Sequence, residues 1–242
     1  MSEFERLSLS INCAGEVLWL HPAHVMYWPA RKTLFVADVH VGKEHRFGRS
    51  GIAIPGGISE QTLRDLFALC DQSGAERLMV LGDFMHAKPS ADESWLETLS
   101  VLLAERPALG IEIVAGNHDK PAGRSLLDGR VLWHADSIVE GAFVLVHEPV
   151  DDPRGYVLSG HLHPAWRLST TRRGGVRAPV FWLRPGHAVL PAFGGFTGAA
   201  RIEPDLREDR LFMTGPDCVI EIPASAGLTK NRFVRKKHRQ DV

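Results

Sequence analysis

Polar side chains that could bind a metal ion follow several short apolar runs in this sequence. The run Ile111–Ala115 ends at a glycine and leads into Asn117, His118 and Asp119. Taken alone, this triplet is typical of an ordinary turn, because such residues bond their own backbone and tolerate unusual dihedral angles. Other apolar runs end in the same way. The polar residues at these run ends are Asp38 and His40; Asp83; Asn117, His118 and Asp119; His147; and His161 and His163.

The chemical types in this set indicate a metal centre. The set contains carboxylates, an amide oxygen and imidazoles, and it lacks a thiolate. Such borderline-hard ligands suit Mn²⁺, Fe or Zn²⁺ better than Cu(I) or an iron–sulfur cluster. In open α/β sheets, ligands gather outside the carboxyl ends of the strands. Side chains that lie far apart in the sequence could therefore converge at one edge of a sheet.

Strands and helices alternate over the first half of the chain and must position these residues. We expect buried strands at Thr33–Ala37, Leu78–Leu81 and Ile111–Ala115, separated by two helices. One helix is expected from Ser59, as the N-cap, to Gly74, and the other from Asp92 to Glu105. This order favours parallel pairing through crossovers. Residues 42–57 are rich in Gly, Arg and Lys and are expected to form an irregular surface loop.

Short strand runs replace the helical period after residue 130. The residues Arg172-Arg173-Gly174-Gly175 are expected to close a hairpin between Trp166–Thr170 and Val176–Leu183. No Pro/Ser-rich linker divides the chain, so we expect one α/β domain with two packed sheets. The remaining strand runs are Val17–Leu20, Val25–Trp28, Phe143–Val146, Tyr156–Ser159, Val189–Phe193, Ala200–Ile202, Leu211–Met213 and Cys218–Ile222.

The polar blocks, taken in order, resemble the motif series of the calcineurin-like metallophosphoesterases. Each block alone is a weak signal, but the complete series over residues 33–163, each block after an apolar run, is a strong one. The resemblance implies an αββα sandwich, with two packed mixed β-sheets flanked by helices, and metal-dependent phosphoester hydrolysis. The blocks are Asp38-x-His40, Gly82-Asp83, Gly116-Asn117-His118-Asp119, His147 and Gly160-His161-x-His163.

Three flanking stretches, Trp28–Arg31, Gly82–His86 and Leu190–Gly198, resemble a small bacterial subgroup of this family. Members of the subgroup are encoded beside an ATP-dependent DNA ligase and an Lhr-like helicase and are described as DNA-repair endonucleases. The resemblance therefore implies DNA as the substrate and this ligase and helicase as partners. Two alternatives stay open: hydrolysis of a small nucleotide or other phosphodiester, and a protein-binding scaffold of the same fold. The intact ligand series argues against the scaffold.

The resemblance also implies roles for the individual ligands. Two divalent ions, of which Mn²⁺ is the first expectation, would clamp the attacking and leaving oxygens at phosphorus and provide a metal-activated hydroxide at neutral pH. Asp83 would bridge the ions and offer one carboxylate oxygen to each. Asp38, His40 and His163 would bind one ion, and Asn117, His147 and His161 the other.

His118 and Asp119 are expected to be catalytic. His118 would contact the phosphate and protonate the leaving oxygen, while Asp119 would hold the ring of His118 through its other nitrogen. His147 is preferred to the nearby His134 as a ligand, because the apolar run Phe143–Val146 leads into His147.

Four further residues are candidates for contact with the substrate, and each has a structural alternative. His86 could instead form a structural hydrogen bond, and Lys43 and Arg46 could lie in a solvated loop. Trp166 could stack on a base or ribose, although tryptophan in this pattern is more often a core residue.

Composition adds expectations about the chain as a whole. Residues 230–239 contain six Lys/Arg and no acid, although the net charge of the chain is −1. We expect a metallophosphoesterase domain at 1–228 and a disordered basic tail at 229–242, for which nucleic-acid binding is the minority interpretation. The sequence has no long apolar run, its N-terminus does not resemble a signal peptide, and its three cysteines are scattered. A cytoplasmic protein without membrane contact is therefore expected.

Overall fold

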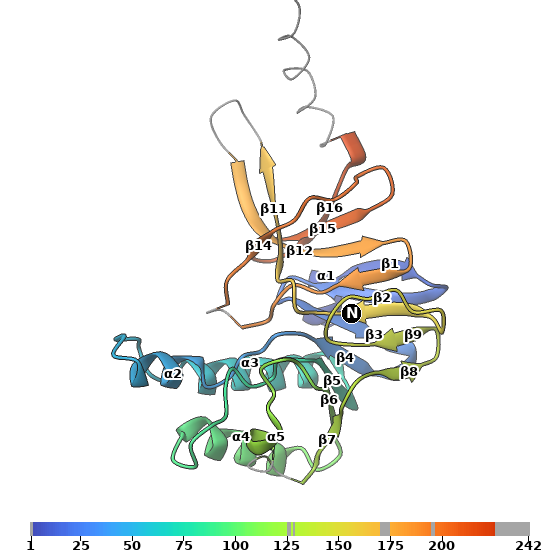
Figure 1. The fold of residues 1–242 in the computed structure, drawn as a ribbon. Coiled ribbons are helices and arrows are strands. Elements are labelled where there is room, and N and C mark those ends of the chain that lie inside the picture. Colours follow the sequence, from blue (N-terminus) through green and yellow to red (C-terminus); the bar gives the residue numbers. More distant parts are fainter. Residues whose placement is uncertain (1, 125–126, 128, 170–174, 195–196, 226–242) are drawn as a thin grey trace, which may run out of the picture.

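The computed structural model describes residues 2–124, 127, 129–169, 175–194 and 197–225. Two β-sheets pack face to face, and helices cover the outer side of the first sheet (Figure 1). The expected α/β fold with two packed mixed sheets is confirmed. The predicted basic tail, 229–242, lies outside the described residues. Among the helices that are described, none has the length and apolar character that a membrane span requires.

The first sheet has seven strands in sequence order, β1 to β7. Neighbours from β1 to β4 are antiparallel, and neighbours from β4 to β7 are parallel. The expected parallel pairing of the alternating strands is therefore confirmed. The strands are β1 (Leu9–Cys13), β2 (Glu16–His21), β3 (Val25–Trp28), β4 (Thr33–Val36), β5 (Arg77–Leu81), β6 (Gly110–Val114) and β7 (Val131–His134).

The second sheet has the order β14-β11-β12-β13-β10-β9-β8, and β15 pairs with both β12 and β16. β11 and β12 pair antiparallel, as the predicted hairpin requires, but the turn between them lies outside the described residues. The predicted strand Val189–Phe193 is wrong beyond Val189, where β13 ends. The strands are β8 (Ile138–Glu140), β9 (Phe143–Leu145), β10 (Tyr156–Ser159), β11 (Pro164–Ser169), β12 (Gly175–Arg184), β13 (His187–Val189), β14 (Ala200–Arg201), β15 (Arg210–Thr214) and β16 (Val219–Ile222).

Apolar cores lie on both sides of the first sheet. Leu34 and Val36 of β4 face the helices, while Phe35 between them faces the second sheet. Alternate side chains of a strand point to opposite faces, so a strand that is buried on both faces is a continuous apolar run. This burial explains the apolar runs of β4 and β5, whereas β6 carries the half-buried Glu112 between Ile111 and Ile113. The helices over the first sheet include α1 (Glu3–Leu7), α3 (Ile58–Ser73) and α4 (Ser94–Glu105), and two short elements are η1 (Pro29–Arg31) and α5 (Pro121–Arg124).

The expected loop at 42–57 is wrong in its first half, which forms helix α2 (Lys43–Arg49). Buried Glu44 fixes this helix, because its carboxylate accepts hydrogen bonds from the Ser59 backbone N–H at 2.6 Å and from the Ser59 hydroxyl at 2.7 Å. The prediction that Ser59 is the N-cap of α3 is therefore wrong. Gly57 takes that position in a left-handed conformation. Because the segment is rich in glycine and arginine, its sequence pattern indicated a loop and not this tertiary contact.

Candidate metal centre

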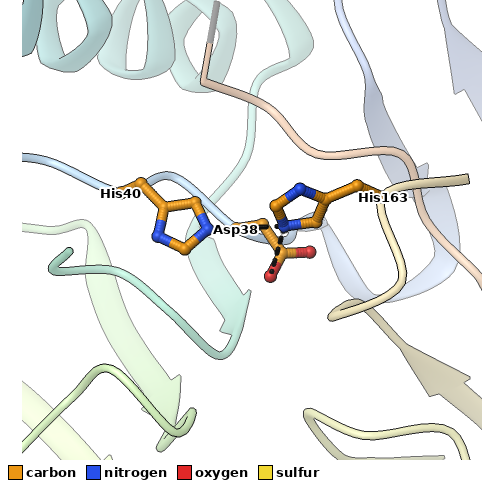
Figure 2. Close-up of side chains that lie close together, drawn as sticks. All are labelled: Asp38, His40 and His163. Carbon is orange, nitrogen blue, oxygen red and sulfur yellow. Dashed lines mark hydrogen bonds and ion pairs between the residues drawn. The ribbon is translucent and has the colours of Figure 1, made fainter. Parts of the chain in front are cut away.

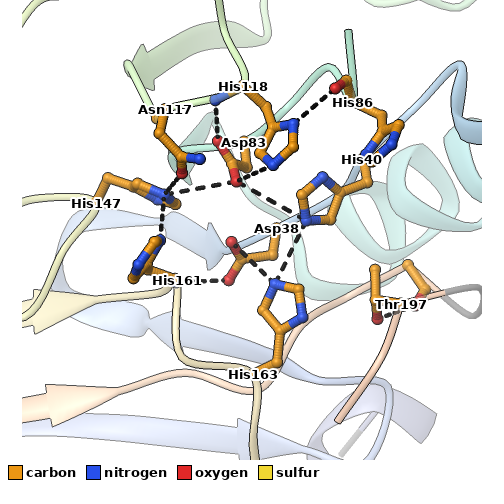
Figure 3. A network of polar contacts seen from close by, with 12 residues as sticks. Asp38, His40, Asp83, His86, Asn117, His118, His147, His161, His163 and Thr197 are labelled. Atoms are coloured by element: carbon orange, nitrogen blue, oxygen red, sulfur yellow. Dashed lines mark hydrogen bonds and ion pairs between the residues drawn. The ribbon is translucent and has the colours of Figure 1, made fainter. Parts of the chain in front are cut away.

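The predicted metal ligands converge at one edge of the sandwich, where the carboxyl ends of strands from both sheets meet (Figure 3). Asp38 and His40 follow β4, Asp83 follows β5, and Asn117 follows β6. The second sheet contributes His147 after β9, and His161 and His163 after β10. The expectation that residues far apart in sequence come together is therefore met by the geometry.

Backbone hydrogen bonds hold the loops after β4 and β5 side by side beyond the strands. The N–H of Asp38 donates to Gly82 O at 3.1 Å, and that of His40 donates to Asp83 O at 2.9 Å. The pairing continues with Val41 N–H to Phe84 O at 2.9 Å. These bonds fix the side chains of the first motif beside the aspartate of the second.

Five of the seven predicted ligands have left-handed backbone conformations, with φ between 46° and 68°. Positive φ is uncommon for residues other than glycine and costs on the order of 1–3 kcal/mol at each position. Only three other non-glycine residues in the described chain share it. Strain concentrated in this way is typical of a functional site. The five ligands are Asp38, His40, Asp83, His161 and His163.

The glycines that precede three of the ligand motifs make room for ligands from neighbouring strands. A Cβ atom on Gly82 would lie 2.1 Å from His147 Nδ1, and one on Gly116 would lie 2.2 Å from Asp83 Oδ1. Any side chain at either position would displace a ligand. Sequence reasoning did not assign this role to the glycines, although their place before each ligand was the available signal.

The first ligand cluster consists of Asp38, His40 and His163 (Figure 2). The Nε2 atom of His163 lies 3.4 Å from His40 Nε2 and 3.4 Å from Asp38 Oδ1. Its Nδ1 lies 2.9 Å from Gly198 O, so Nδ1–H donates to that carbonyl and Nε2 keeps its lone pair. Asp38 is fully buried, and its Oδ1 has no hydrogen bond. A bound cation would offset the free-energy cost of burying this oxygen without a hydrogen bond.

The second cluster brings Asn117, His147 and His161 together beside Asp83. His147 Nε2 lies 3.0 Å from Asn117 Oδ1 and 3.1 Å from His161 Nδ1. His147 Nδ1 donates to the carbonyl oxygen of Leu81 at 3.0 Å, so Nε2 faces the cluster as an acceptor. Acceptor atoms that converge without a shared donor fit a metal ion.

Asp83 lies between the two clusters, and its Oδ2 is within 4 Å of a histidine nitrogen of each. Oδ2 lies 3.9 Å from His40 Nε2 and 3.6 Å from His147 Nε2. Oδ1 accepts the backbone N–H of His118 at 2.9 Å. These positions suit a residue shared by two ions, and the expected division of one oxygen to each ion stays a prediction. The donor set as a whole fits two divalent cations.

Burial and neighbouring charged groups shift the pKa of three ligand side chains. Burial, followed by the neighbouring imidazoles, lowers the pKa of His40 to about 2, so its ring is neutral and able to bind a metal. For His163, burial opposes protonation, but the Asp38 carboxylate outweighs it and raises the pKa. Burial also raises the pKa of Asp83, which lies close to the carboxylate of Asp38. Divalent cations would relieve this crowding of carboxylates.

His118 presents Nε2 to the centre while its other ring nitrogen is held by the backbone. Nε2 lies 4.0 Å from Asp83 Oδ2. Nδ1 lies 2.7 Å from the carbonyl oxygen of His86, to which Nδ1–H donates. The ring also stacks on that of His86, with centroids 4.9 Å apart and an interplanar angle of 19°. His118 is thus well oriented without belonging to either ligand cluster.

The predicted role of Asp119 as the residue that orients His118 is wrong. Its buried carboxylate accepts the backbone N–H groups of Met85 at 2.8 Å, Gly116 at 3.0 Å and Phe84 at 3.2 Å. These bonds tie the loop after β5 to the turn after β6. Asp119 therefore shapes the backbone on which Asp83 and His118 stand, and its place in the predicted catalytic pair is not supported.

The candidate substrate residues occupy different surroundings. The ring of His86 lies beside His118 and His40, as expected for a residue near the site. Lys43 lines a small cavity with His40 and Thr197, and Arg46 is exposed on α2. Trp166 packs against the apolar cluster of Val180, Ile202, Leu211, Met213 and Ile222, as its structural alternative proposed.

The rejected candidate His134 lies outside both clusters. Its Nε2 pairs with Glu112 Oε2 at 2.8 Å, so the preference for His147 agrees with the geometry. His147, by contrast, is buried and faces Asp83.

Comparisons with known proteins agree with the geometry of the site. The calcineurin-like phosphoesterase family model matches residues 31–174. Among solved structures, the nuclease MPE of Pseudomonas putida is 32% identical with a TM-score of 0.73, over 89% of this chain and 100% of that chain. The phosphoesterase Yfce of E. coli is 18% identical over 79% of this chain and 98% of that chain, with a TM-score of 0.38, too low to support an argument. No curated protein matches. The family match spans more than half of the sequence, so the chain belongs to the calcineurin-like phosphoesterase family and is a metal-dependent phosphoesterase.

Proposed function

We propose that this chain is a nuclease that hydrolyses phosphodiester bonds in DNA with two bound divalent metal ions. The observation that carries the proposal is the position of Asp83 Oδ2, within 4 Å of a histidine nitrogen in each of the two ligand clusters. Paired metal sites of this kind serve in-line displacement at phosphorus. The similar chain from Pseudomonas putida is itself a nuclease.

The ligand roles follow the two clusters, with Mn²⁺ as the proposed metal. When bound, the two ions supply a hydroxide nucleophile at neutral pH and neutralise the charge of the diester. Asp83 would be shared by the two ions, and its Oδ1 also accepts the backbone N–H of His118. Asp38, His40 and His163 would hold one ion, and Asn117, His147 and His161 the other.

His118 is proposed to contact the phosphate and to protonate the leaving oxygen from Nε2. An acid requires the imidazolium form, in which both ring nitrogens carry protons. The His86 carbonyl accepts from Nδ1, so Nε2 is the ring nitrogen that faces the centre, 4.0 Å from Asp83 Oδ2. The side chain of His118 is 38% exposed, which leaves room for a substrate to approach Nε2.

DNA is proposed as the substrate because cationic side chains stand beside the centre. Lys43 lines a cavity together with the ligand His40, and Arg46 is exposed in the following turn of α2. Both can bind a phosphate backbone. We propose DNA repair as the setting, with an ATP-dependent DNA ligase and an Lhr-like helicase as the partners that the resemblance implies.

A cleavage assay tests this function. Purified protein with Mn²⁺ should nick supercoiled DNA or cleave single-stranded DNA, and Asp83→Ala should lose both metal and activity. Turnover of bis(p-nitrophenyl) phosphate or cyclic nucleotides without any cleavage of DNA would favour the small-substrate alternative. If the wild-type protein hydrolyses no phosphodiester and Asp83→Ala leaves its biological function intact, the protein acts as a scaffold.

A further inference from the structure

Three exposed arginines lie on one face of the second sheet. Arg167 of β11 and Arg177 of β12 are direct partners in the antiparallel register. Arg201 of β14 is the register partner of Ala165, which lies two residues before Arg167. Residues two apart on a strand, and residues directly opposite across strands, point to the same side of a sheet. The three side chains therefore form one basic row, the Arg167–Arg177–Arg201 row.

The row continues the inner face of the second sheet. On β12, Phe181 and Leu183 share the side of Arg177 by alternation, and both pack in the core between the sheets. The other side of β12 carries Val180 and Trp182, which belong to the outer apolar cluster. In Figure 1 the β11–β12 hairpin extends beyond the region where the two sheets pack. The face thus changes from apolar to basic where the first sheet no longer covers it.

The basic row starts beside the candidate metal centre. His163 immediately precedes β11, and its carbonyl accepts the N–H of Ala200 at 2.8 Å, at the start of β14. A strand rises about 3.3 Å for each residue, so Arg167 lies about 13 Å along β11 from His163. That distance corresponds to about four nucleotides of one strand, measured along the axis of duplex DNA.

The charges of the row are poorly compensated within the described residues. Like charges directly opposite in a sheet are destabilising, yet neither Arg167 nor Arg177 has an ion pair in the described chain. The neighbouring register pair on this face is Ala165 with Pro179, and neither residue is acidic. Arg201 lies 4.0 Å from Glu203, but both side chains are at least 75% exposed, so this pair is weak.

We propose that the Arg167–Arg177–Arg201 row binds backbone phosphates of DNA within a few nucleotides of the phosphate being cleaved. Guanidinium groups match phosphate oxygens in two-point hydrogen bonds and keep their charge at every physiological pH. Contacts of this kind position the strand without reading its sequence. The inference rests on the proposed function and adds to it a path for the DNA.

The test compares the double variant Arg167→Gln/Arg201→Gln with the control Arg6→Gln, an exposed arginine on α1. Arg177 is left in place because it also donates to the Ala199 carbonyl. We would measure kcat/KM for cleavage of a labelled single-stranded oligonucleotide by the Mn²⁺-loaded proteins across a range of KCl. The slope of log(kcat/KM) against log[salt] should shrink by roughly 0.7 for each arginine removed. Turnover of bis(p-nitrophenyl) phosphate and the thermal midpoint should not fall.

The possible failures are distinguishable. If the double variant cleaves DNA with the wild-type KM and salt slope, the row does not bind DNA, and the proposed nuclease function stands. Equal losses on DNA and on the small diester would show that the arginines support the centre itself, which overturns the inference. If the wild-type protein hydrolyses only the small diester, the proposed function and this inference both fall.

Discussion

The Nδ1 atom of His118 lies 2.7 Å from the backbone carbonyl oxygen of His86, and this contact, not Asp119, orients the ring. The side chains of the two neighbouring residues therefore make different contacts. His118 faces the centre through Nε2, whereas Asp119 binds backbone N–H groups. Substitutions of the two residues are therefore expected to have different effects.

His118→Asn is expected to keep both metal ions and lose most turnover. General acid–base groups contribute typically 10²–10⁴-fold, so kcat for DNA cleavage should fall by about that factor. Neither ligand cluster includes the ring of His118, so metal content measured by mass spectrometry should match that of wild type. Loss of metal in this variant would show that His118 is itself a ligand.

Asp119→Ala is expected to destabilise the fold. The change leaves three backbone N–H groups without their acceptor, and each unsatisfied buried group costs about 1–3 kcal/mol. Urea denaturation should show a loss of at least about 3 kcal/mol in the free energy of unfolding. A variant of wild-type stability with low kcat would instead restore Asp119 to a catalytic role.

The contrast between these two residues shows what sequence could predict. β4 and the apolar part of β5 are buried on both faces, and Ile111, Ile113 and Val114 of β6 are buried, so these strands and the ligands that follow them could be predicted. The contact that a side chain makes across a loop could not be predicted from the sequence. The Glu44–Ser59 contact that orders α2 joins segments with no shared pattern, and the His86 carbonyl that holds His118 leaves no trace in residue type.

His147→Ala is expected to lower the metal content, and His134→Ala is its matched control. His147 Nε2 lies 3.6 Å from Asp83 Oδ2, whereas His134 pairs with Glu112 and belongs to neither cluster. The control should keep its metal and lose at most about 1 kcal/mol from a partly exposed hydrogen-bonded pair. Equal metal loss in both variants would indicate a general effect on folding.

Gly116→Ala is expected to impair metal binding although it adds only a methyl group. The new Cβ would lie 2.4 Å from the backbone nitrogen of Asp83, which cannot move as a flexible side chain would. Displacement of groups that support metal ligands typically costs 10–100-fold in affinity, and titration of the apoprotein with Mn²⁺ would measure it. Gly56→Ala meets no atom within 4 Å and should bind metal normally. Normal affinity in Gly116→Ala would show that the loop relaxes freely.

Acid should destabilise the protein partly through His21, which lies outside the metal centre. Its buried ring stacks on Phe4 with centroids 4.4 Å apart, and its Nδ1 accepts the N–H of Ala23 at 3.1 Å. Burial lowers its pKa to about 4, against about 6.5 in the unfolded chain.

Between these two pH values the unfolded chain binds the proton more tightly, so stability present above pH 6.5 is lost as the pH falls towards 4. The difference corresponds to about 3 kcal/mol. His21→Phe keeps an aromatic ring against Phe4 but cannot titrate. Its free energy of unfolding should therefore fall less between pH 7 and pH 4 than that of wild type. Parallel pH profiles for the two proteins would show that His21 titrates normally in the folded state.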